Sequence, residues 1–91
     1  MKVEKSNRKN KRYVAIFNDG ERIHFGFKGG STYLDHKDKT KRKNYIARHE
    51  VLEKKFYNDP KRPATLSRFI LWGDATNLNQ AIKDYEKKFN V

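Results

Sequence analysis

Asp19-Gly20 stands between two runs of residues that favour strands. A type I′ turn needs positive φ at both central positions, and Asp-Gly is one of the dipeptides that supply them. The sequence therefore predicts a β-hairpin over residues 13–27. Because an isolated hairpin is only marginally stable, we also expect a short third strand near Ser31–Leu34.

The register of this hairpin can be predicted from its apolar residues. A two-residue loop pairs Ile16 with Ile23 and Val14 with Phe25, which places four apolar side chains on one face. A three-residue loop would instead pair Ile16 with Arg22. We expect the two-residue loop, because it gives the sheet a coherent apolar face.

Helical spacing of apolar residues dominates the rest of the chain, in three segments that are residues 39–56, 63–72 and 77–89. Asp38 is a suitable N-cap for the first segment and Thr76 for the third. Pro63 suits the first turn of the second, and Gly73 suits the position after its end. The expected fold class is α+β, with an N-terminal β-hairpin or small antiparallel sheet packed against three helices.

The apolar stripe of the first helix contains Tyr45, His49, Leu52 and Phe56. This spacing predicts that the stripe packs onto the core, with His49 as a packed core histidine. The aromatic residues among the basic ones, such as Tyr45, have two interpretations. They either stack on single-stranded bases or pack beneath a helix, and a small domain needs its aromatic residues inside.

The net charge of +11 is concentrated in two blocks. Residues 1–12 and residues 36–48 each hold six cations and one acid, a net of +5 apiece. Residues 1–12 are otherwise polar, which predicts a flexible basic arm. Residues 13–91 contain all of the aromatic residues and are expected to form one compact α+β domain.

Clustered positive charge predicts an anionic partner, either nucleic acid or an acidic protein assembly. The alternatives are a solvated helix face, whose charges pair with acids elsewhere, and a disordered tail that promotes solubility. The candidate contact residues are Lys9, Lys11, Arg12, Lys39, Arg42, Lys43 and Arg48.

Other chemistry has little support in the sequence. The chain has no cysteine, and its three histidines lack the spacing of metal ligands, so we expect no metal and no cofactor. No nucleophile–base pattern is present, which favours a non-enzymatic protein. No apolar run is long enough to cross a bilayer, so no membrane partner is expected.

A resemblance to a known family covers roughly Tyr33–Trp72. The matching pieces are His24-Phe25-Gly26, His36-Lys37-Asp38, Arg42-Lys43, Tyr45-Ile46, Arg48-His49, Leu66-Ser67-Arg68 and Ile70-Leu71-Trp72. With these pieces the chain resembles a family of small uncharacterised basic proteins of large DNA viruses and phages. The chain departs from that family's pattern between Glu50 and Ala64, where the family usually has a tryptophan and a glycine. In this stretch the chain has Phe56 and no glycine.

The resemblance implies a viral origin and a role associated with the virion or its genome. We therefore expect a small basic structural protein of a virus or phage particle, which binds the capsid shell or the packaged genome through its two basic blocks. It would be found in the virion, or in the host cytoplasm during infection. The alternatives are a free nucleic-acid-binding regulator and, less favoured, a small metal-dependent nuclease.

Overall fold

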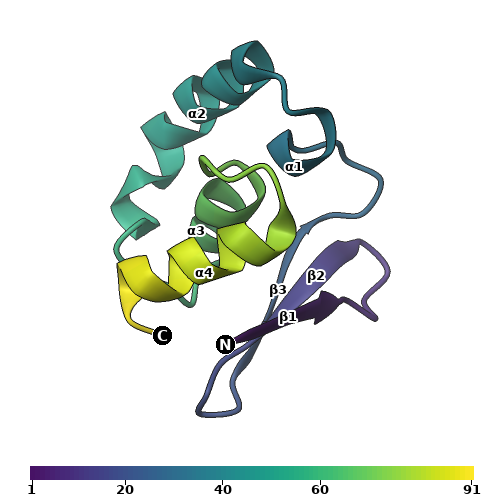
Figure 1. The fold of residues 1–91 in the computed structure, drawn as a ribbon, viewed down its shortest axis with the longest axis vertical. Helices are drawn as coiled ribbons and strands as arrows, with labels where there is room; N and C mark the ends of the chain where they lie inside the picture. Colours follow the sequence, from purple (N-terminus) through teal and green to yellow (C-terminus); the bar gives the residue numbers. More distant parts are fainter.

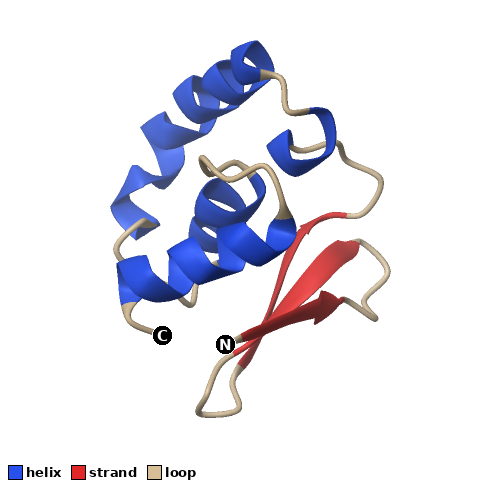
Figure 2. Ribbon diagram, viewed as in Figure 1, coloured by secondary structure: helices blue, strands red, loops and turns tan.

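A three-stranded antiparallel sheet and a set of helices make up the computed structural model, which describes Met1–Val91 and confirms the predicted α+β class (Figure 2). The sheet has the order β1-β2-β3, with strands β1 (Lys2–Lys5), β2 (Lys11–Ile16) and β3 (Arg22–Phe27). The helical elements are α1 (Tyr33–His36), α2 (Lys39–Glu53), the 3₁₀ turn η1 (Lys54–Phe56), α3 (Pro63–Leu66), the π-helical turn η2 (Ser67–Leu71) and α4 (Leu78–Phe89).

The hairpin is present, but its predicted register is wrong. The Phe17 N–H donates to the Glu21 carbonyl at 2.9 Å, which leaves a three-residue loop and pairs Ile16 with Arg22. Gly20 has a φ of +89°, as expected for a type I turn followed by a left-handed glycine. Asp19-Gly20 therefore marked the turn correctly but not its length.

The one-residue shift changes which side chains of β2 face the core. Ala15 and Phe17 point inward with Phe25, whereas the prediction had placed Val14 and Ile16 on that face. Val14 is also buried, but it lies outside the core cluster, between Glu4 and His24 in the cross-strand register. Both alternating sets in β2 are apolar, so the pattern of this strand alone did not decide between them.

The third strand comes from the N-terminal segment and not from Ser31–Leu34. Lys2–Lys5 pairs antiparallel with β2, and a short connection over residues 6–10 joins the two strands. The expectation of a flexible arm over residues 1–12 is therefore wrong for β1 and for the start of β2. The physical reason is that β2 would otherwise expose an unpaired edge, and Val3 adds a side chain packed against the core.

The core lies between the sheet and the segments α3, η2 and α4 (Figure 1). Its buried members are Ala15, Phe17, Phe25, Leu66, Ile70, Leu71, Ala81 and Tyr85. Pro63 occupies the first turn of α3, as predicted. Helix α4 begins one residue later than predicted, because Asn77 and not Thr76 accepts the capping hydrogen bond from the Gln80 N–H at 2.9 Å.

The predicted second helix ends in a π-helical turn. The Trp72 N–H donates to the Ser67 carbonyl at 3.0 Å, five residues back. Gly73 follows, and a Cβ at this position would clash with the carbonyl oxygen of Phe69. The wide turn and the glycine together bring Trp72 against helix α2, where it stacks on Tyr45.

Helix α2 is the outermost element, on the side of α3 away from the sheet (Figure 1). Asp38 caps it as predicted, accepting from the Thr40 N–H at 2.9 Å and the Lys41 N–H at 3.1 Å. Tyr45 is its one buried residue. The predicted packing of Leu52 is wrong, since this side chain is 73% exposed.

Candidate functional site

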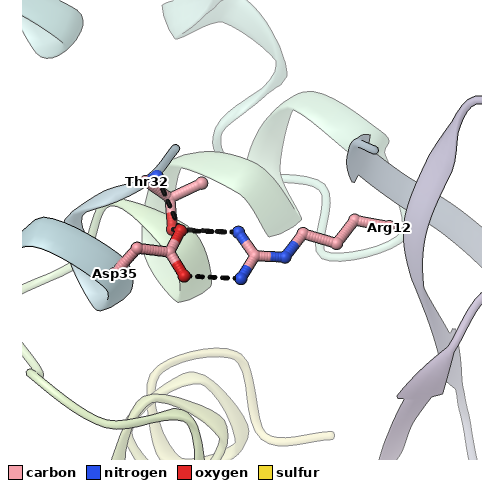
Figure 3. A network of polar contacts seen from close by, with 3 residues as sticks. All are labelled: Arg12, Thr32 and Asp35. Carbon is pink, nitrogen blue, oxygen red and sulfur yellow. Dashed lines mark hydrogen bonds and ion pairs between the residues drawn. The ribbon is translucent and has the colours of Figure 1, made fainter. Parts of the chain in front are cut away.

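Arg12, one of the predicted contact residues, forms an ion pair with Asp35 of the same chain (Figure 3). Its guanidinium donates to both carboxylate oxygens of Asp35, at 2.7 and 2.6 Å. Asp35 also accepts from the backbone N–H of Thr32 at 2.8 Å and from its hydroxyl at 2.9 Å. These contacts, the Arg12 guanidinium first, hold the pKa of Asp35 well below its usual range. Arg12 thus joins strand β2 to helix α1.

The donors of Arg42 are likewise used within the protein. Its Nε–H donates to the carbonyls of Trp72 at 3.1 Å and Gly73 at 3.0 Å, and its Nη2 donates to Asp74 at 2.7 Å. Arg68 donates to the same Trp72 carbonyl at 3.1 Å. Burial, and then the charge of Arg42, lower the pKa of Arg68. Arg42 therefore fastens α2 to the end of the π-helical turn and is not a free contact.

The remaining five predicted residues make no ion pair and no side-chain hydrogen bond; they are Lys9, Lys11, Lys39, Lys43 and Arg48. All are exposed except Lys11, which is half-buried. The interpretation of a helix face whose charges pair with acids elsewhere therefore holds for Arg42 and not for these five. Their charge is available to a partner.

The cations at the start of α2 interact unfavourably with the helix dipole. Four of its first five residues are cations, namely Lys39, Lys41, Arg42 and Lys43, and the first turn has no acid. The N-terminal end of a helix carries partial positive charge, so each exposed cation there costs about 0.3–1 kcal/mol. Asp38 offsets part of this cost as the N-cap. An anionic partner would relieve the rest.

A groove of about 560 Å³ separates α2 from the β2–β3 end of the sheet and the loop that follows it. We call it the basic groove, and the lining residues used below are Lys11, Phe27, Ser31, Tyr45, Arg48, His49, Glu53 and Trp72. Its volume is in the range of small-molecule sites. It brings together two predicted contacts that are far apart in sequence, Lys11 and Arg48. Lys9, Lys39 and Lys43 do not line it.

Three aromatic rings stack along the α2 side of the groove. Trp72 and Tyr45 are parallel, with centroids 4.1 Å apart and an interplanar angle of 3°. His49 covers the other face of Tyr45 at 4.0 Å and 21°, and its Nδ1 is 2.7 Å from Glu53 Oε1. Burial raises the pKa of Tyr45. His49 is 34% exposed at the groove, so it is not the packed core histidine that was predicted.

Sequence reasoning missed Phe27 and Trp72 as site residues. Phe27 ends the predicted hairpin, and its side chain is 69% exposed. Trp72 ends the predicted second helix, and its side chain is only partly buried. The glycines near these residues, Gly29 and Gly73, were the available signal: Gly29 has a φ of +92° in the turn after Phe27, and Gly73 lies close to the Phe69 carbonyl directly after Trp72.

The structure contains neither a cluster of metal ligands nor a membrane-spanning helix. No three His, Asp or Glu side chains converge as ligands for a metal ion. None of the helices is long and apolar enough to cross a membrane.

Comparison with known proteins gives a single family. A family of unknown function, DUF5754, matches residues 1–49, which comprise the sheet, α1 and most of α2. All seven predicted contact residues lie in this stretch. No curated protein and no solved structure matches the chain. The match covers more than half of the 91 residues, and the chain belongs to the DUF5754 family.

Proposed function

We propose that this protein binds nucleic acid without catalysing a reaction on it. The observation that carries the proposal is the basic groove, where the unpaired cations Lys11 and Arg48 flank aromatic side chains. Cations with interleaved aromatic rings suit a phosphate backbone and its bases, whereas an acidic protein surface would use the cations alone. Lys39 and Lys43, four residues apart and therefore near each other on α2, add a second positive surface on a different side of the helix from Arg48.

Salt dependence follows from this arrangement. Each phosphate that a Lys or Arg neutralises releases condensed counterions, so the logarithm of the binding constant falls linearly with the logarithm of salt concentration. The slope is about −0.9 per contact for duplex DNA and about −0.7 for single strands. The slope of the wild-type protein therefore counts the cations in contact with the ligand.

The test is a titration of labelled DNA and RNA at several salt concentrations. The variant Lys39→Gln/Lys43→Gln/Arg48→Gln removes three unpaired cations, and we expect a weaker affinity and a slope shallower by about 2 for single strands and about 2.7 for duplex DNA. Lys83→Gln is the matched control, because Lys83 is an exposed cation of α4 without an ion pair. A wild-type protein that binds no nucleic acid even at low salt would overturn the proposal and leave an acidic protein partner.

The biological setting that we propose is a virus or phage particle, with the packaged genome or the capsid shell as partner. Its support is the sequence resemblance described above. A particle component should copurify with particles in a fixed ratio to the capsid protein, whereas a free regulator should not. Metal-dependent cleavage of any nucleic acid during the titrations would instead favour a nuclease.

A further inference from the structure

Phe27 is an aromatic ring held exposed at the edge of the basic groove. It is the last residue of β3 and is 69% exposed. The Gly30 N–H donates to the Phe27 carbonyl at 3.0 Å, and Gly29 between them has a φ of +92°, so a tight turn follows the ring. The N–H of the next residue, Lys28, donates to the Asn10 carbonyl at 3.2 Å. The backbone around Phe27 is therefore fixed while its ring remains open to solvent.

The opposite wall of the groove offers the end of the aromatic stack. Tyr45 has a ring on each of its faces, so it has no face left for a ligand. His49 is the outer ring of the three and is 34% exposed. A planar group that enters the groove thus meets an aromatic ring on both the loop side and the α2 side.

The polar lining complements an anion with a planar base. Lys11 and Arg48 have no acidic partner, whereas the acid in the groove, Glu53, already bonds His49. Ser31 adds a hydroxyl that no side chain of the protein engages. The groove therefore combines two available positive charges with exposed aromatic surface, and its 560 Å³ is larger than one base requires.

We infer that the basic groove takes an unpaired nucleotide, with its base against Phe27 and neighbouring phosphates at Lys11 and Arg48. The inference rests on the proposed nucleic-acid binding and adds a class of ligand to it. A base inside a duplex has both faces covered by its neighbours, so it cannot stack on Phe27 unless the duplex opens. The protein should therefore prefer single strands to duplex, through stacking that is tolerant of sequence.

The decisive experiment compares a single strand with a blunt-ended duplex of two complementary strands of the same length, each as DNA and as RNA, at one low salt concentration. Loss of a base-stacking ring typically weakens single-strand binding by about 5-fold or more. We expect this loss for Phe27→Ala, with the duplex affinity unchanged. Leu52→Ala is the matched control, since Leu52 is 73% exposed on α2 and does not line the groove. It should leave both affinities unchanged.

A second readout uses Trp72, the one tryptophan of the chain, which lines the groove. Its fluorescence should change when a single strand binds and should stay constant with inorganic polyphosphate, which has charge but no base. Among the cation variants, Arg48→Gln should make the salt dependence of single-strand binding shallower by about 0.7 in slope. It should also reduce the fluorescence change, whereas Lys43→Gln, outside the groove, should not.

The possible failures are distinguishable. Equal wild-type affinity for single strand and duplex, or a Phe27→Ala variant that binds single strands like wild type, would overturn the nucleotide site and leave nucleic-acid binding intact. Polyglutamate that binds as tightly as a single strand and competes with it would also overturn the site. Absence of binding to every nucleic acid would overturn the proposed function itself.

Discussion

Helices α2 and α4 are both regular, but they are held to the molecule by different forces. Helix α4 has 12 residues and buries Ala81 and Tyr85 in the core, with Tyr85 also donating to the Pro60 carbonyl at 2.6 Å. Helix α2 has 15 residues and buries Tyr45 alone. Its other attachments are the hydrogen bonds of Arg42 and the aromatic stack.

The difference shows how a small domain can display charge. A helix that relies on apolar burial turns much of its circumference toward the core, and a cation there would be costly to desolvate. A helix held along one line by an arginine and stacked rings leaves its flanks free. Helix α2 can therefore carry Lys39, Lys43 and Arg48 without an acidic partner.

The largest expected effect tests the core side of this comparison. Ile70 is fully buried between the sheet and α4. Ile70→Ala should lower the free energy of unfolding by about 2–5 kcal/mol, because it removes buried area and leaves a cavity. Urea denaturation followed by far-UV circular dichroism measures this. Leu52→Ala on α2 should change stability by less than about 0.5 kcal/mol. A large loss with Leu52→Ala would mean that α2 packs through its apolar residues.

A smaller effect is expected where α2 is fastened. Arg42→Ala removes donors to the Trp72 and Gly73 carbonyls and the ion pair with Asp74, and should cost about 1–3 kcal/mol. Hydrogen exchange should accelerate in α2 more than in α4, because the loss is local. Arg42→Lys should not restore protection, since an ammonium cannot reproduce the planar fork.

The exposed Lys43→Ala is the matched control and should leave exchange in α2 nearly unchanged. Equal acceleration throughout the chain for Arg42→Ala would contradict the comparison. It would show that α2 unfolds only together with the core.

The smallest expected effect concerns the link between sheet and α1. Arg12→Gln breaks the bidentate pair with Asp35, and solvent screening limits the cost to about 1 kcal/mol at neutral pH. The pKa of Asp35 is lowered in the folded state, so the pair stabilises the protein above the ordinary carboxyl pKa of about 4. Its contribution is lost as pH falls from there toward the lowered value.

Urea denaturation across this pH range provides the measurement. The stability difference between wild type and Arg12→Gln should shrink in acid. Arg22→Gln, at an exposed cation of β3 without an ion pair, should show no such trend. A difference between wild type and Arg12→Gln that stays constant in acid would exclude the ion pair as its source.

Local features predicted much of the fold. Asp38, Pro63 and Asp19-Gly20 each mark an element boundary through contacts within a few residues, and all three boundaries are present. The N-terminal strand was missed because its pairing with β2 is a contact between segments. Its composition of Lys, Val and Glu is also that of an exposed edge and resembles a mobile tail.

The candidate site was predictable only in part. The sequence indicated two basic blocks, yet nothing in it separates Arg42 from Lys43 or Arg12 from Lys11. That separation depends on which side chain meets Asp74, Asp35 or a free carbonyl across the fold. The basic groove itself draws on two strands, the loops beside them and the helical elements α2, α3 and η2, so no single stretch of sequence contains it.

By itself, the amino-acid sequence determined the α+β class, the position of the hairpin turn, the starts of α2 and α3, and the excess of positive charge. These depend on backbone preference, capping and composition, which act over a few residues. The tertiary structure alone decided the hairpin register, the origin of the third strand and which cations remain unpaired. Each of these depends on a contact between distant segments, and such a contact forms only when packing brings the two partners together.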